Sequence, residues 1–207
     1  MRACTIFCAG DFTALAQPIP TGSTVIAADG GLRHTQRLGL QPDVILGDFD
    51  SLGHIPQGAQ VFPVEKDDTD SMLAIKQGLS MGCDRFYLYG ALDGHRVDHT
   101  MANFQALHYL CDHGARGYLI GNRQIVCALQ KGKLEFPAHF QGYFSVFCLG
   151  ADAKGVTLRG LQYETENAAL TAGFPLGVSN RFVGNPATVA VENGTLLLIW
   201  DRENGIV

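Results

Sequence analysis

The sequence lacks the signals of several protein classes. Its 207 residues include 17% charged residues and carry a net charge of −5 with no run of Lys or Arg, so we expect no nucleic-acid-binding surface. No apolar stretch approaches the ~18 residues of a membrane span. Asp11 interrupts the first apolar run too early for a signal peptide. We therefore expect a cytoplasmic protein that binds neither nucleic acid nor membrane.

Familiar cysteine and glycine motifs are also missing. The six cysteines form no Cys-x-x-Cys pair, and most lie in apolar runs, which is typical of reduced core residues in the cytosol. Neither a Walker A segment nor a Gly-x-Gly-x-x-Gly fingerprint occurs. Gly30-Gly31 after an apolar run could let the backbone approach phosphates, but by itself it is more often a turn.

The apolar pattern predicts an N-terminal three-layer α/β domain with a mostly parallel sheet over residues 1–122. Strand-like runs alternate there with helix-like segments. The predicted strands are 4–9, 24–28, 44–46, 60–64, 86–89 and 118–120, and the predicted helices are 32–38, 70–81 and 97–111.

Over residues 123–207, strand-like runs follow one another without a helix between them. They predict a C-terminal all-β domain, sandwich-like or barrel-like, or a continuous β extension of the first sheet. The runs are 125–129, 134–136, 143–149, 156–163, 188–191 and 196–200. Asn193-Gly194 between the last two runs predicts a type I′ hairpin.

Two acidic residues directly follow the third predicted strand. Asp48 and Asp50 stand at alternate positions after Gly47, and alternate side chains of an extended segment share a face. Two unit charges ~4 Å apart at an effective dielectric constant of ~20 repel by roughly 4 kcal/mol. A cation should therefore lie between them, and an oxygen-ligated divalent ion is the natural candidate. An isolated Asp-x-Asp is more often a solvated turn.

Other polar segments also follow predicted strands, namely Asp29, 66–71 and 90–98. Ligands of parallel sheets bind beyond the carboxyl ends of the strands, so these segments should converge on one edge. Asp70 is then favoured as a metal ligand, whereas Asp67 and Asp68 could simply favour the start of a helix. Lys66 could hold a phosphate oxygen or neutralise the local acid.

The predicted helix over 97–111 begins among charged residues. Arg96 suits a phosphate or a purine face, and Asp98 could accept a hydrogen bond from a ligand or cap the helix. We interpret His99 as a structural or ribose-contacting residue. One helical face is expected to contain Val97, Met101, Phe104, His108 and Cys111, and His99 and Asn103 share another.

The order of these segments resembles the thiamin pyrophosphokinase family. The matching segments are Asp29-Gly30-Gly31, Gly47-Asp48-Phe49-Asp50-Ser51, Asp67-x-Thr69-Asp70, Gly94-x-Arg96-x-Asp98-His99-Thr100 with Asn103, and Gly177-Val178-Ser179-Asn180. They run from about residue 27 to residue 192. Each motif is weak by itself, but their combination in this order is specific.

The resemblance implies transfer of pyrophosphate from ATP to the hydroxyethyl group of thiamin, with Mg²⁺ as cofactor and AMP as product. It also implies a catalytic domain over 1–122, a thiamin-binding domain over 123–207, and a homodimer with active sites between subunits. Asp48, Asp50 and Asp70 would bind magnesium, and Asp98 or a metal-linked Asp could accept the proton. The implied ATP-site residues are Asp29, Gly30, Gly31, Lys66, Asp67, Thr69, Arg96, Asp98, His99 and Asn103. Ser179 and Asn180 would contact thiamin, and Phe182 and Trp200 are both candidates for its aromatic platform.

Three alternatives remain. A pyrophosphokinase for a pterin alcohol would share the chemistry and differ in the acceptor. A phosphatase of the haloacid dehalogenase type would use Asp48 as nucleophile and Asp50 as acid, but Leu52 replaces the expected Thr or Val, and the motif follows the third strand instead of the first. A non-enzymatic sensor of nucleotides or vitamins would leave the acidic set unexplained.

Overall fold

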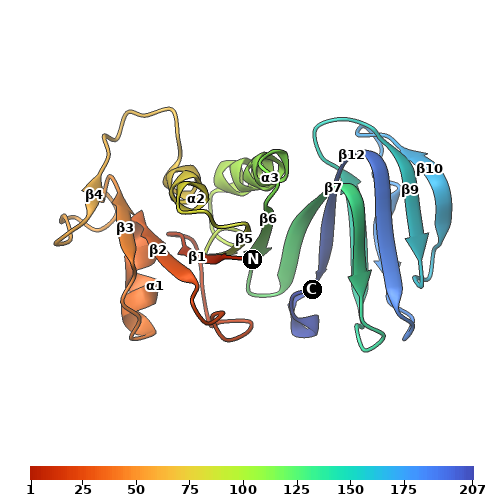
Figure 1. The fold of residues 1–207 in the computed structure, drawn as a ribbon, viewed down its shortest axis with the longest axis horizontal. Coiled ribbons are helices and arrows are strands. Elements are labelled where there is room, and N and C mark those ends of the chain that lie inside the picture. The colour runs from red at the N-terminus through yellow and green to blue at the C-terminus, as the bar shows by residue number, and fades with distance from the viewer.

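The computed structural model describes residues 1–207, and its N-terminal half is a parallel α/β layer structure. The strands are β1 (Ala3–Phe7), β2 (Thr24–Ala28), β3 (Val44–Gly47), β4 (Gln60–Val61), β5 (Arg85–Tyr89) and β6 (Arg116–Ile120). They pair in parallel in the order β4-β3-β2-β1-β5-β6. The helices are α1 (Leu32–Arg37), α2 (Asp70–Ser80) and α3 (Val97–Asp112). Helices α2 and α3 cover one face of the sheet and α1 lies on the other (Figure 1), which confirms the predicted three layers.

The C-terminal half continues the same sheet with antiparallel strands. These are β7 (Gln124–Phe136), β8 (Tyr143–Cys148), β9 (Ala153–Arg159), β10 (Thr165–Leu170), β11 (Gly177–Arg181) and β12 (Ala187–Asp201). Strand β7 pairs with β6 and, along nearly its whole length, with β12. The sheet then divides, because the first part of β12 pairs with β9 and its last part pairs with β8. The β-rich half is therefore a continuous extension of the first sheet (Figure 1).

The predicted hairpin at Asn193-Gly194 is wrong. Both flanking runs belong to β12, and both pair with β7. The register shifts between Val191 and Thr195, so three residues of β12 stand opposite Lys131 alone in a bulge, where Gly194 has a φ of 95°. Pairing with the long strand β7 has thus outweighed the local preference of Asn193-Gly194 for a turn. For the same reason the two runs predicted over 125–136 form one strand.

Helix α3 buries the expected apolar face only in part, because Phe104 and Cys111 pack half-buried against the core whereas Val97 and Met101 do not. Its buried residues are Asn103, Ala106, Leu107 and Leu110. Val97 and Met101 are 72% and 56% exposed. The apolar positions of the first turns therefore face away from the sheet, while the polar Asn103 packs inside.

The core forms two hydrophobic clusters, one on each face of the sheet. The first contains residues of β1, β2 and β5 packed against Ile75 of α2 and Leu107 of α3. The second begins with Phe7 and Tyr89 on the opposite face of the parallel strands and continues without a break to Trp200 in the β-rich half. The two halves thus share one core. The predicted boundary at residues 122 and 123 lies between β6 and β7, and it stays a prediction.

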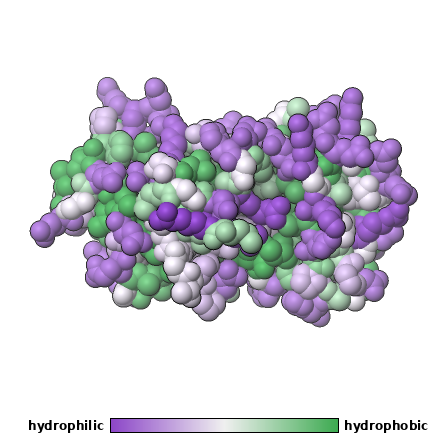
Figure 2. Space-filling view, in the orientation of Figure 1, coloured by the Kyte–Doolittle hydropathy of each residue, from purple (hydrophilic) through white to green (hydrophobic).

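Three further features concern the cysteines, the helices and the surface. All six cysteines are free thiols. No helix has both the length and the apolar character needed to cross a membrane. Hydrophobic side chains on the face drawn in Figure 2 gather in separate patches among hydrophilic ones.

Candidate active site

A cleft of about 670 Å³ opens at the carboxyl ends of the parallel strands. Its walls come from the segments that follow β1, β2, β3 and β5, from the loop before α2, and from the start of α3. Strand order reverses between β1 and β5, and crevices at such switch points are the usual ligand sites of open α/β sheets. The sequence-predicted residues that line the cleft are Asp29, Asp48, Asp50, Lys66, Thr69, Asp70, Arg96, His99 and Asn103. Gly30, Gly31, Asp67 and Asp98 do not line it.

Three carboxylates meet in this cleft. Asp29, Asp48 and Asp50 each offer an oxygen, and these oxygens lie within 4.8 Å of one another. Asp29 is 6% exposed, and its Oδ1 has no hydrogen-bond partner. Burial of a carboxylate oxygen without a partner costs free energy. A cation bound among the three carboxylates would remove this cost. The donor set therefore fits a divalent cation that prefers oxygen ligands.

Asp48 and Asp50 converge by a tight turn, which corrects the expectation of an extended segment. Strand β3 ends at Gly47, and Phe49 adopts a φ of 60° with its ring buried. The Asp50 amide donates to Asp48 Oδ1 at 3.2 Å. Gly47 is needed here because a Cβ at that position would lie 3.0 Å from Asp29. The backbone turn and the buried ring together bring both carboxylates to one side.

Lys66 links Asp48 to Asp70. Its Nζ lies 2.5 Å from Asp48 Oδ2 and 3.1 Å from Asp70 Oδ1. Burial lowers the pKa of Lys66, but the hydrogen bond to Asp48 and the attraction of both carboxylates outweigh it and the pKa is raised. Burial raises the pKa of Asp48, and the Lys66 hydrogen bond more than reverses this. The pKa of Asp70 stays raised, because burial and the charges of Asp48 and Asp29 outweigh Lys66.

Asp70 thus lies in the same cleft but outside the group of three. It is the first residue of α2, after Thr69, whose hydroxyl caps the helix by accepting from Met72 N at 3.3 Å. Asp68 pairs with Lys76, with Nζ 2.6 Å from Oδ2. Asp68 and Thr69 therefore have structural partners in the chain, while Asp70 Oδ1 accepts no hydrogen bond despite its closeness to Lys66.

The residues expected at the nucleotide fall into two kinds. Arg96 donates from Nε and Nη2 to the two oxygens of Asp98, at 3.2 and 2.5 Å, and both side chains are exposed beside the cleft. Asn103 is buried, where its Nδ2 donates to Ala91 O at 2.6 Å and its Oδ1 accepts from Ser71 at 2.8 Å. Asn103 therefore fixes α3 to the loop after β5 and to α2.

The glycine pair after β2 has a packing role. A Cβ at Gly31 would lie 1.9 Å from the carbonyl oxygen of Phe7, and one at Gly30 would lie 2.9 Å from Ser51 Oγ. At Gly31 only glycine allows the backbone to approach Phe7 of β1 this closely.

The residues expected at thiamin lie elsewhere, in the β-rich half. Ser179 is exposed on β11, and its amide donates to Ser145 Oγ at 3.1 Å. Asn180 is buried, where its Oδ1 accepts from Tyr163 N and its Nδ2 donates to Tyr163 O. Phe182 and Trp200 are 7% and 1% exposed within the aromatic core, so neither ring offers a free face in this structure.

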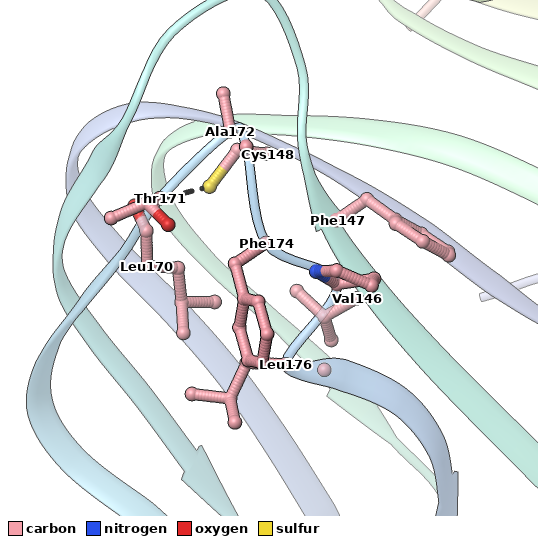
Figure 3. Close-up of a pocket in the computed structure, with 11 residues that line it drawn as sticks. Val146, Phe147, Cys148, Leu170, Thr171, Ala172, Phe174 and Leu176 are labelled. Carbon is pink, nitrogen blue, oxygen red and sulfur yellow. Dashed lines mark hydrogen bonds between the residues drawn. The ribbon is translucent and has the colours of Figure 1, made fainter.

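A small apolar pocket lies directly before β11. It measures about 120 Å³ and is lined by Val146, Phe147, Cys148 and residues 170–177 (Figure 3). The side chains of Phe174 and Leu176 extend from the loop of this pocket, and they are 65% and 66% exposed. Sequence reasoning missed Phe174, although it stands only three positions before the Gly177–Asn180 segment. The acidic cleft contains no residue beyond Asn103, so the two sites are separate within one chain.

Both halves of the chain match models of known protein families. The family model "Thiamin pyrophosphokinase, catalytic domain" matches residues 16–119, and "Thiamin pyrophosphokinase, vitamin B1 binding domain" matches residues 131–196. A thiamine pyrophosphokinase of Bacillus subtilis is 27% identical over 183 residues, which cover 84% of this chain and 85% of the relative.

Solved structures show the same fold. A crystal structure of thiamine pyrophosphokinase from Bacillus subtilis superposes with a TM-score of 0.84 at 24% identity, over 97% of this chain and 99% of that one. The yeast thiamin pyrophosphokinase superposes with a TM-score of 0.72 at 14% identity, over 97% and 86%. With both family models matched in the expected order, the chain belongs to the thiamin pyrophosphokinase family.

Proposed function

We propose that the acidic cleft holds ATP and Mg²⁺ and directs the β-phosphorus of ATP to the hydroxyethyl oxygen of thiamin, with AMP as leaving group. Family membership makes the chain a kinase that acts on thiamin and makes thiamin diphosphate. The observation that supports the cleft as its site is the meeting of Asp29, Asp48 and Asp50, with an unpartnered oxygen on the buried Asp29.

The residues of the cleft would act by positioning and charge. Phosphoryl transfer depends on these more than on covalent help from the protein. Asp48 and Asp50 would hold the cation, with Asp29 and Asp70 completing its surroundings. When bound, Mg²⁺ neutralises charge on the polyphosphate and fixes its oxygens. Arg96 and Lys66 would contact phosphate oxygens, and His99 would face the nucleoside.

Asp98 suits positioning better than proton transfer. The hydrogen bond from Arg96 lowers the pKa of the Asp98 carboxyl, which makes it a weak base. We therefore propose that Asp98 orients the guanidinium of Arg96 toward the cleft. Asn103, Thr69, Gly30 and Gly31 would shape the nucleotide site through the contacts described above.

Thiamin would bind at the β11 end of the molecule. Ser179 is exposed there, Asn180 fixes the backbone beside it, and the pocket below Phe174 is apolar. At about 120 Å³ this pocket is smaller than an ordinary ligand site of ~300 Å³ or more, so it would hold only part of the vitamin. Phe174 is the exposed aromatic side chain closest in sequence to the Gly177–Asn180 segment.

A homodimer would join the two sites. The cleft draws on residues 8–103 only, whereas the vitamin B1 binding match covers residues 131–196. Exposed apolar side chains lie near both sites, at Val97 and Met101 and at Phe174 and Leu176. We propose that two copies pair so that the β11 end of one faces the cleft of the other. The free cysteines support a cytoplasmic location.

The direct test supplies ATP, Mg²⁺ and thiamin and measures the products. We expect AMP and thiamin diphosphate in equal amounts, and no turnover when EDTA removes the metal. A pterin alcohol serves as the alternative acceptor in a parallel reaction. Release of inorganic phosphate without AMP would contradict the proposal and favour a phosphatase.

A further inference from the structure

We propose that Lys66 is an exchangeable counter-ion: it holds Asp48 and Asp70 before a divalent cation binds, and it moves to a phosphate oxygen when cation and nucleotide occupy the cleft. This inference rests on the proposed function only for the identity of the ligand. It assigns two successive partners to one side chain and makes the cation and Lys66 competitors for the same carboxylates.

The geometry places the ammonium where a bridging cation would go. Lys66 Nζ lies 2.5 Å from Asp48 Oδ2 and 3.1 Å from Asp70 Oδ1, and all three side chains are largely buried. The other oxygen of Asp48 accepts from the Asp50 amide at 3.2 Å. A cation that bridges Asp48 and Asp70 must therefore displace Nζ.

Charge and hydrogen bonding favour such an exchange. The ammonium of Lys66 pairs with Asp48 and Asp70, and Asp48 also belongs to the group of three carboxylates with Asp29 and Asp50. Oδ1 of Asp29 is buried without a hydrogen-bond partner, and the only partner of Asp70 Oδ1 is its ion pair with Lys66, so one ammonium does not satisfy the cluster. A divalent ion would neutralise it better, and the displaced ammonium would then face the incoming polyphosphate. The flexible four-carbon stem of lysine allows the movement.

Lys76 provides a matched comparison. Its Nζ lies 2.6 Å from Asp68 Oδ2, so it is also a lysine paired with an aspartate close to the start of α2, two residues before the helix begins. Both partners are more exposed, however, and Asp68 does not belong to the group of three carboxylates. An ordinary surface ion pair of this kind contributes little.

The test measures cation binding and turnover separately in Lys66→Met. Mn²⁺ is titrated without nucleotide and followed by electron paramagnetic resonance. We expect Mn²⁺ affinity to rise about tenfold, because the competing ammonium is gone, while kcat/KM for ATP falls about 10–100-fold, because the phosphate contact is lost. Lys66→Arg keeps the charge and should bind Mn²⁺ no more tightly than the wild type. Lys76→Met should change neither quantity.

Opposite signs in the two measurements distinguish exchange from other roles. A lysine that only stabilises the fold would lower both Mn²⁺ affinity and turnover when removed, and a lysine that only contacts phosphate would leave Mn²⁺ affinity unchanged. Either result overturns the inference. Circular dichroism checks the fold, and Lys66→Gln replaces Lys66→Met if that variant is unfolded. If the wild type makes no AMP, the proposed function fails, but the Mn²⁺ titration still decides whether Lys66 competes with a cation.

Discussion

At the scale of single residues, the acidic site depends on unusual backbone conformations. Asp29 and Phe49 have φ values of 47° and 60°, in the left-handed region that costs non-glycine residues about 1–2 kcal/mol each. Glycine would adopt these angles freely, but it would supply neither the carboxylate nor the buried ring. The side chains account for the strained conformations, because Asp29 provides an oxygen to the proposed cation site and the buried ring of Phe49 holds the turn that brings Asp48 and Asp50 together.

Asp50→Asn tests the ligand role directly. We expect turnover to fall by about 10²–10³-fold, because one anionic oxygen for the cation is lost, which corresponds to several kcal/mol. Thermal stability should be unchanged or slightly higher, since Asp50 is exposed and repels two neighbouring carboxylates. AMP formation and thermal unfolding are the measurements. Turnover like that of the wild type would remove Asp50 from the metal site.

The sequence located the acidic residues because each follows a strand, and parallel strands present their carboxyl ends at one edge. It did not reveal that Asp29 joins Asp48 and Asp50 more closely than Asp70 does, because that depends on the turn at Phe49 and on Lys66. Nor could it show that Trp200 is buried and Phe174 exposed. Both facts depend on contacts between strands far apart in the chain.

At the scale of secondary-structure elements, β12 organises the β-rich half. It pairs with β7 on one side and with β8 and β9 on the other, and its bulge marks the point where the sheet divides. Sequence reasoning found both apolar runs but placed a turn between them, because Asn-Gly is a strong local hairpin signal. The parallel half was predicted well, because its alternation of strands and helices is a local pattern.

Gly194→Ala tests the bulge. Gly194 has a φ of 95°, and an added Cβ would lie 2.9 Å from the backbone at Asp152 and Ala153. We expect the free energy of unfolding in urea to fall by about 1–3 kcal/mol. Gly173→Ala is the control, because nothing lies within 4 Å of its Cβ position, and its stability should be unchanged. Equal stability of both variants would contradict a strained bulge.

At the scale of the whole molecule, the cleft and the segment proposed to bind thiamin belong to different halves of one sheet. Subunit complementation tests whether two copies complete each other. Asp50→Asn disables the cleft, and Ser179→Trp blocks the β11 end. If active sites form between subunits, random pairing of the two inactive variants should restore about a quarter of the wild-type turnover, since half of the mixed dimers' sites are intact.

Each variant alone should remain inactive, and size-exclusion chromatography with light scattering gives the mass of the assembly. If each active site lay within one subunit, mixing the two variants would restore no turnover. A monomeric mass with full activity would also exclude the proposed pairing.

The pairing of β6 with β7, which joins the two halves, has a consequence for protein engineering. Exchange of the vitamin-binding half between relatives at residue 122 cuts no strand, yet it transfers one side of the β6–β7 pairing and part of the core that Tyr118 and Trp200 share. In such a hybrid, the side chains on the two sides of the β6–β7 pairing come from different proteins and have not evolved to pack against each other. Transplants that carry the matching β6 face along should express and remain active more often than those that move residues 123–207 alone.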